Sequence, residues 1–258
     1  MDNHFKFTSS VVGVPLFFVL FLWFVYWLEI RFDFDFDENG IFPRTFSGLQ
    51  GVFFSPFIHS DLNHLYNNSM PLLVLLAALQ FFYAKQAYAV IAIGILFSGI
   101  LTWLIGRSSY HIGASGLVYV LVSFIFVKGI LTRYYRLVAL SLAVIMLYGG
   151  ILWYAFPKVD DTISWEGHLA GLISGVALSL LYKTPEYKTP TKYDWEKPDF
   201  DPVEDKFMQR FDENGNFVNL IENEEVGVPI EIQAYFTSES KIAYSIVANN
   251  EEEPNAES

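Results

Sequence analysis

The sequence predicts an all-α integral membrane protein with six membrane-spanning helices and a polar C-terminal tail. Only 17% of its 258 residues are charged, against about 25% in soluble domains. Aromatic residues reach 18%, which is typical of a surface that meets lipid and its interface. Apolar runs of bilayer-crossing length recur along residues 1–183. Together these observations argue against an ordinary soluble protein.

The six candidate helices are separated by polar, glycine-containing or proline-containing segments. They cover residues 11–30, 64–82, 87–106, 115–130, 136–156 and 167–182. The first run is too long for a cleaved signal peptide, and no small-residue cleavage site follows it. The fourth and the last are short, since 16 residues rise only about 24 Å, less than a hydrocarbon core of about 30 Å. Each of the two is expected to start inside the membrane, where protein or water must cover its backbone.

Residues 184–258 form an acidic tail. Residues 1–182 hold 9 basic and 10 acidic side chains, whereas residues 183–258 hold 7 and 18. Pro185 prevents the last helix from continuing. The segment 228–247 alternates enough for a short β-hairpin, and the final ten residues are expected to be disordered. No basic surface for nucleic acid is present in this charge pattern, and the lack of cysteine excludes a thiolate nucleophile.

The distribution of Lys and Arg predicts that both termini are cytoplasmic. With the N-terminus inside, the inner segments hold seven of these residues and the outer loops hold four. No arginine-rich organellar transit peptide precedes the first run, so we expect a multi-pass protein of a bacterial inner membrane. The first outer loop, residues 31–62, is either solvated or a Phe-rich segment partly embedded in the membrane.

The motif Gly113-Ala114-Ser115-Gly116 begins the fourth candidate helix. Small residues of this kind usually serve close helix packing in membranes. Ser115, however, opens the helix at its outer end, where backbone N–H groups are unpaired and the helix dipole is positive. This position favours a developing oxyanion, so the motif is a candidate for chemistry as well as packing.

A histidine opens the last candidate helix. An ionisable residue at this depth is costly, so His168 is a functional candidate. The alternative is an interfacial histidine that faces lipid headgroups. Gly167, Gly171 and Gly175 recur every four residues beside it and allow another helix to approach closely. We therefore expect His168 to face a neighbouring helix.

The third motif is His59-x4-His64-x3-Asn68. His64 and Asn68 are four residues apart, so they share one helix face and can both donate to a single oxygen. The alternative is a plain helix start, capped by one of the polar residues at 60, 61 and 63. His59 lies outside the helix and is interpreted as structural.

The three motifs converge if the chain alternates across the membrane. The second, fourth and last helices then all run inward from the outer side, which places His64, Ser115 and His168 at one depth. A nucleophile, a base and oxyanion donors are the groups that acyl transfer requires. Tyr119 lies one turn after Ser115 and can stack on the His168 ring, although it is equally a core aromatic.

Taken jointly, these motifs resemble the rhomboid family of intramembrane serine proteases, in its basic six-helix bacterial form. The patterns H-x4-H-x3-N, G-x-S-G-x-x-Y and H-x-x-G-x-x-x-G occur in the family's order within residues 51–182. The resemblance implies that Ser115 is the nucleophile and His168 the general base of a dyad without an acidic third member. It also implies an oxyanion hole formed by the Ser115 N–H and the side chains of His64 and Asn68.

The resemblance has further implications for structure and partners. Gly113 would let the backbone bend before the nucleophile, while Gly171 and Gly175 would hold the last helix against the fourth. The family's first loop usually carries a Trp-Arg pair, and residues 40–44 read Gly-Ile-Phe-Pro-Arg instead. The expected partners are the lipid bilayer and membrane proteins whose transmembrane helix is cleaved in or near its outer end. No metal or cofactor is implied.

Other chemistries fit the sequence poorly. The metalloprotease motif H-E-x-x-H is missing, and none of the six runs contains an aspartate. Lys128 follows Ser115 by 13 residues, about 20 Å along a helix, which is too far for a Ser–Lys dyad. A transporter would need ionisable residues within its helices. The remaining alternative is a non-catalytic rhomboid-like protein that binds transmembrane helices, although such proteins typically lose the nucleophile or the base.

Overall fold

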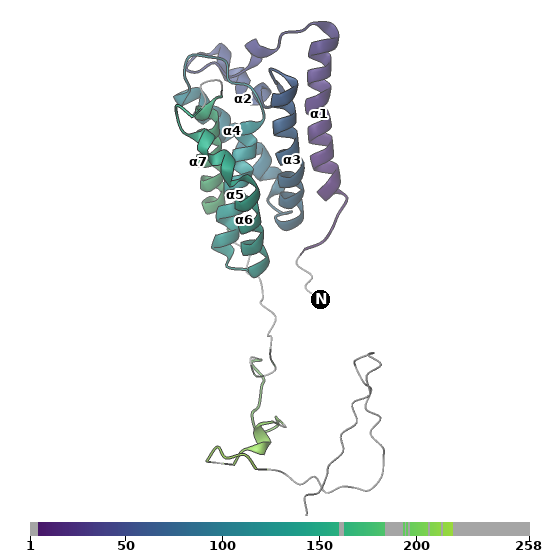
Figure 1. Cartoon of the computed structure of the whole chain (residues 1–258), viewed down its shortest axis with the longest axis vertical. Helices are drawn as coiled ribbons and strands as arrows, with labels where there is room; N and C mark the ends of the chain where they lie inside the picture. The colour runs from purple at the N-terminus through teal and green to yellow at the C-terminus, as the bar shows by residue number, and fades with distance from the viewer. Residues whose placement is uncertain are drawn as a thin grey trace, which may run out of the picture. The chain divides into compact units, whose positions relative to one another are not determined.

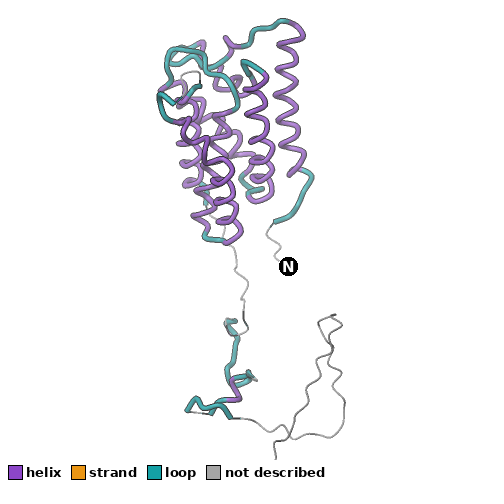
Figure 2. The backbone as a smooth tube through the Cα atoms, in the orientation of Figure 1, coloured by secondary structure: helices purple, strands orange, loops and turns teal. Residues whose placement is uncertain are grey.

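The computed structural model describes residues 5–159, 163–183, 193, 195, 197–205, 207–212 and 214–218. The chain divides into two compact units, Met1–Pro190 and Thr191–Ser258. The first unit is a bundle of helices that run side by side, with loops at their ends (Figures 1 and 2). In the second unit, the described residues include one 3₁₀ turn, Met208–Arg210. The hairpin expected over residues 228–247 lies outside the described residues.

Among the described residues, six helices build the bundle, and short helices fill the first loop, which follows the first of the six. The six are α1 (Ser10–Phe32), α3 (Leu62–Phe82), α4 (Ala87–Ile105), α5 (Ser115–Thr132), α6 (Tyr135–Tyr148) and α7 (Trp165–Leu181). The loop holds η1 (Asp37–Asn39), η2 (Ser47–Gln50), α2 (Gly51–Phe54) and η3 (Ser55–Phe57). Within the described ranges the chain forms isolated β-bridges but no strand. The predicted all-α class is confirmed.

In the part of the chain that the structure describes, five spans are long and apolar enough to cross a membrane. One of them joins α6 to the 3₁₀ helix η4 (Gly149–Ala155), and the apolar α7 is shorter, with 17 residues. The expected helix over 136–156 is therefore an α-helix that tightens into 3₁₀ at Gly149-Gly150, a pair that disfavours α-helix. Helix α5 has 18 residues and reaches Thr132, so it is about 27 Å long rather than the expected 24 Å.

Helix α5 is the centre of the bundle. It packs against α3, α4, α6 and α7, while α1 lies at one edge beside α3 (Figure 1). Its middle turns are fully buried, including Val120, Phe124 and Ile125. Near its C-terminal end the buried Lys128 donates through Nζ to the carbonyl oxygens of Ser179 and Tyr182. These bonds satisfy backbone acceptors at the end of α7 that have no partner within that helix.

Helix α7 meets α5 almost backbone to backbone. A Cβ added to Gly171 would lie 2.3 Å from the carbonyl oxygen of Gly116. A Cβ added to Gly175 would lie 2.0 Å from Ser123 Oγ and 2.3 Å from the carbonyl oxygen of Val120. All three distances are far inside van der Waals contact, so any larger side chain at either glycine must push the two helices apart.

The segment that leads into α5 is anchored by backbone hydrogen bonds. Ile41 and His111 exchange N–H···O bonds of 3.0 and 2.9 Å, and the Gly113 N–H donates to the Ser55 carbonyl at 2.8 Å. The Ala114 N–H donates to His59 Nε2 at 3.4 Å. Gly113 has φ of +104°, a conformation that glycine adopts without strain. The start of α5 is therefore held by a buried imidazole and by two stretches of the first loop.

We expect Gly175→Ala to destabilise the protein by about 1–3 kcal/mol, because the added methyl overpacks the α5–α7 contact. Gly13→Ala is the matched control, since a Cβ at Gly13 meets no atom within 4 Å. Thermal unfolding of both variants in detergent checks the prediction. A melting temperature for Gly175→Ala equal to that of Gly13→Ala would contradict the described helix contact.

The buried His59 predicts a pH-dependent stability. Burial lowers its pKa to about 3, and the neighbouring His64 imidazole contributes to the shift. Below about 6.5, the unfolded chain binds a proton at this residue that the folded chain does not bind. Stability should therefore fall as the pH drops from about 6.5 toward 3, by up to about 1.4 kcal/mol per pH unit. His59→Gln keeps an acceptor without titrating, so its stability between pH 7 and 4 should depend less on pH. Parallel curves for the two proteins would refute this source of acid sensitivity.

Candidate active site

Five of the expected site residues line one cavity of about 1010 Å³. Its walls come from the N-terminal ends of α3, α5 and α7, from η4 and from the segment before α5. The five are His64, Asn68, Ser115, Tyr119 and His168. The other four expected residues, His59, Gly113, Gly171 and Gly175, are not among its lining residues. The three distant sequence motifs therefore meet at one hollow.

Ser115 is the first residue of α5 and is half-buried in the cavity wall. The preceding Ala114 makes no side-chain cap, so the first-turn N–H groups of α5 have no capping oxygen from this residue. Among the described residues, no hydrogen bond joins the Ser115 hydroxyl to His168. Catalytic hydrogen bonds are often long in an unliganded site and tighten when substrate binds.

His168 is held by one hydrogen bond and one ring contact. Its Nδ1 lies 2.9 Å from the carbonyl oxygen of Tyr154. A carbonyl can only accept, so Nδ1 carries the proton and Nε2 of the neutral ring is a free base. Tyr119 stacks on the imidazole with a centroid distance of 4.3 Å and an interplanar angle of 13°. The Tyr119 hydroxyl donates to the Ile151 carbonyl, so both rings are fastened to η4.

His64 and Asn68 flank the backbone just before Ser115. A Cβ on Gly113 would lie 2.4 Å from His64 Nε2 and 3.6 Å from Asn68 Nδ2. Asn68 Nδ2 donates one N–H to the His64 carbonyl at 3.1 Å, which leaves its second N–H for another acceptor. Since only glycine leaves room for the two side chains, Gly113 determines how closely they approach the start of α5.

The protonation of His64 follows from its neighbours. Ser60 donates its hydroxyl to Asp61 at 2.9 Å, and the same oxygen lies 3.2 Å from His64 Nδ1. The Ser60 proton is already used, so His64 Nδ1 must be the donor in that contact. The backbone N–H of His64 donates to the Asp61 carboxylate and keeps the pKa of that carboxylate below its usual value. Nε2 of a neutral His64 is then an acceptor, and it becomes a donor only in the imidazolium form.

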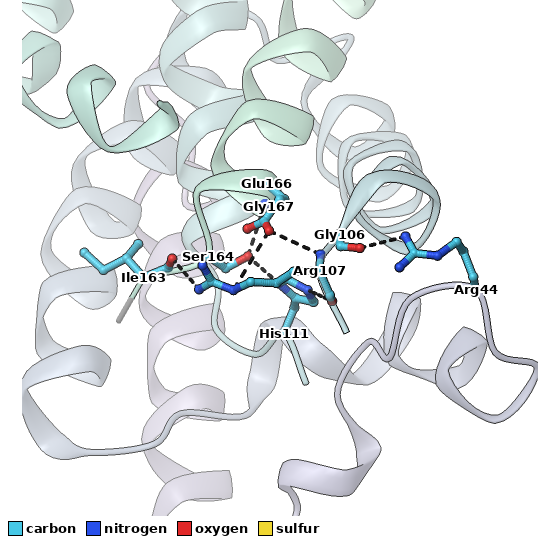
Figure 3. A network of polar contacts seen from close by, with 8 residues as sticks. All are labelled: Arg44, Gly106, Arg107, His111, Ile163, Ser164, Glu166 and Gly167. Carbon is cyan, nitrogen blue, oxygen red and sulfur yellow. Dashed lines mark hydrogen bonds and ion pairs between the residues drawn. The ribbon is translucent and has the colours of Figure 1, made fainter. Parts of the chain in front are cut away.

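Glu166, two residues before His168, binds the segment that precedes α5. Its Oε1 accepts the Arg107 N–H at 3.2 Å and lies 3.9 Å from Arg107 Nε (Figure 3). The Glu166 side chain is buried. The bond that orients His168 thus comes from the Tyr154 carbonyl, whereas this carboxylate is engaged by Arg107.

Several contacts around the site were not predicted from the sequence. The carbonyl groups of Ile151 and Tyr154 have no side-chain signature, and the sequence predicted a continuous helix over 136–156 although the Gly149-Gly150 pair is a signal of an irregular end. A further unpredicted bond joins His111 to Ser164. The pattern Ser164-x-x-Gly167 indicates an N-cap, whose side chain accepts the Gly167 N–H.

The comparisons with known proteins identify the family of the chain. The Rhomboid domain model matches residues 47–184. An uncharacterized protein of Mycobacterium tuberculosis, Rv1337, is 39% identical over 165 residues, which cover 59% of this chain and 67% of the relative. An uncharacterized protein of Mycobacterium leprae, ML1171, is 37% identical over 161 residues, covering 59% of this chain and 64% of the relative. Because the family model covers more than half of the chain, this multi-pass membrane protein belongs to the rhomboid family.

Proposed function

We propose that the protein is an intramembrane serine endopeptidase in which Ser115 is the nucleophile and His168 the general base. The observation that carries the proposal is the hydrogen bond from His168 Nδ1 to the Tyr154 carbonyl. It leaves Nε2 without a proton, in the cavity that Ser115 also lines. A hydroxyl and an unprotonated, oriented imidazole in one cavity are the groups that nucleophilic catalysis requires.

The reaction follows from these two groups. The Ser115 hydroxyl gives its proton to His168 Nε2 while Oγ attacks the substrate carbonyl carbon. The tetrahedral intermediate collapses as the C–N bond breaks, and the imidazolium returns the proton to the leaving amine. Water then attacks the acyl-enzyme by the same route and releases the second product. The stacked Tyr119 keeps the His168 ring from rotating between these proton transfers.

The oxyanion is stabilised by donors at the start of α5. The Ser115 N–H belongs to the first turn of the helix, where the dipole is positive. Asn68 Nδ2 supplies a second N–H from the α3 side of the cavity. His64 supplies a third only as the imidazolium, because in the neutral ring Nδ1 carries the proton and Nε2 is an acceptor. Asn68 needs no change of protonation, so it is the side-chain donor with the simpler role.

The substrate class is a membrane protein with a single helix that enters the cavity from the bilayer. A helix buries its carbonyls in hydrogen bonds, so the segment must unwind before Ser115 can attack. Glycine, proline and small residues near the cleavage point favour unwinding. With both termini in the cytoplasm of a bacterial cell, the cavity lies toward the outer face of the inner membrane, and cleavage occurs near the outer end of the substrate helix.

Ser115→Ala should abolish covalent labelling by a fluorophosphonate probe and cleavage of a single-span model substrate. The reason is the loss of the only atom that forms the acyl-enzyme. Ser174→Ala is the control, because that buried hydroxyl bonds only the Ala170 carbonyl of its own helix. Gel fluorescence and product mass spectrometry measure the two activities. Equal behaviour of the Ser115 variant and the wild type would favour the non-catalytic, helix-binding alternative.

Asn68→Ala should lower kcat by about 10²–10³, the effect of removing one oxyanion donor. KM should stay within about twofold, since the lost bond forms mainly in the transition state. Steady-state cleavage of the same model substrate in liposomes provides both constants. An unchanged kcat would remove Asn68 from the oxyanion site, and a change confined to KM would make it a substrate-binding residue instead.

A further inference from the structure

Each member of the proposed dyad is preceded, four residues earlier, by a polar residue of a second pair. His111 precedes Ser115, and Ser164 precedes His168. His111 Nδ1 and Ser164 Oγ lie 2.5 Å apart, and Figure 3 shows the two side chains pointing toward each other. The segment that leads to the nucleophile is therefore bonded directly to the N-cap of the helix that carries the base.

The direction of every proton in this contact can be assigned. His111 Nε2 lies 3.1 Å from the Arg107 carbonyl, so Nε2 carries the proton and Nδ1 accepts from the Ser164 hydroxyl. Ser164 Oγ in turn accepts the Gly167 N–H at 3.2 Å. Burial lowers the pKa of His111, which favours the neutral ring that this sequence of bonds requires. Gly167, Ser164, His111 and Arg107 thus form one directed chain.

The surroundings hold the His111 ring in place. His111 is only 4% exposed, and a Cβ on Gly106 would lie 2.8 Å from its Nε2. Arg44 donates to the Gly106 carbonyl at 2.7 Å from the first-loop side, and Arg107 donates to the Ile163 carbonyl at 2.8 Å (Figure 3). The His111 ring therefore has little freedom to bind another hydrogen-bond partner. A fixed ring is needed if its bond to Ser164 is to keep the two segments at a constant distance.

We propose that His111 and Ser164 are positioning residues whose hydrogen bond sets the separation of Ser115 and His168. The inference rests on the proposed function. Toward the inner side, Gly171 and Gly175 fix the distance between α5 and α7. On the other side of the dyad, the His111–Ser164 bond holds the segment before α5 against the N-cap of α7. With both contacts in place, the dyad lies between two fixed points. A misplacement of about 1 Å can lower a rate about 10²-fold.

The experiment uses the full chain in detergent and compares wild type with Ser164→Ala, Ser164→Thr and Ser164→Gly. We measure the second-order rate constant of fluorophosphonate labelling, and kcat and KM on a single-span model substrate. Ser164→Ala should slow labelling and lower kcat at least about tenfold with little change in KM. Ser164→Thr keeps the hydroxyl and should restore most of the rate. Ser164→Gly retains a tolerated N-cap residue but loses the bond to His111, so it should be as slow as Ser164→Ala.

Ser141→Ala separates positioning from a general loss of stability. Ser141 is another buried serine, and its hydroxyl joins α6 to the Ile125 and Phe126 carbonyls of α5, away from the cavity residues. It should lower the melting temperature without slowing the labelling of the folded protein. If Ser164→Gly folds and labels at the wild-type rate, the positioning role is overturned while the proposed function stands. If wild type itself neither labels nor cleaves, the proposed function fails and the inference fails with it.

Discussion

The close approach of α7 to α5 is the contact on which the site depends. Lipid tails are as apolar as leucine, so helices in a bilayer associate through tight packing and hydrogen bonds rather than through the hydrophobic effect. Here the packing comes from Gly171 and Gly175 against the backbone of α5. At the C-terminal ends of the two helices, Lys128 adds hydrogen bonds to the last carbonyls of α7. Two residues that are distant in the sequence, Ser115 and His168, come to one cavity because these two helices touch along their length.

The irregular end of α6 has a direct consequence at the site. In a continuous α-helix, the carbonyls of Ile151 and Tyr154 would accept N–H groups four residues later. Here the 3₁₀ geometry of η4 replaces that pattern and ends at Ala155, and the two oxygens accept from the side chains of Tyr119 and His168. The Gly149-Gly150 pair disfavours α-helix, and the irregular segment that follows it supplies the Tyr154 carbonyl. That carbonyl decides that Nδ1 of His168, the proposed base, carries the proton. This is a case in which departure from regular helix supplies the acceptors that a polar site inside the bundle needs.

The sequence predicted the helices and the motifs better than the contacts between them. Hydropathy over about 20 residues is a strong signal, so the membrane spans agree with the structure to within a few residues, apart from the 3₁₀ end of α6. The four-residue spacing of Ser115 and Tyr119 allowed either a stack on His168 or a plain core position, and the structure has the stack. The Tyr154 carbonyl could not be predicted, because every residue carries the same backbone group. The His111–Ser164 pair depends on how two loops meet, which only the tertiary packing decides.

The partner of His168 also decides where stabilisation must come from in the proposed mechanism. A carboxylate that orients a histidine stabilises the imidazolium by its charge, whereas the Tyr154 carbonyl offers only a dipole. The face of the Tyr119 ring adds a cation–π contact to the imidazolium, worth about 0.5–2 kcal/mol. A buried carboxylate, in contrast, would cost several kcal/mol in desolvation before any chemistry occurs. An uncharged partner avoids that cost but gives the transition state less electrostatic help. The remaining rate enhancement must then come from the oxyanion donors and from the positions of the reacting groups. For this reason the contacts that position Ser115 relative to His168 matter more here than they would beside a charged third residue.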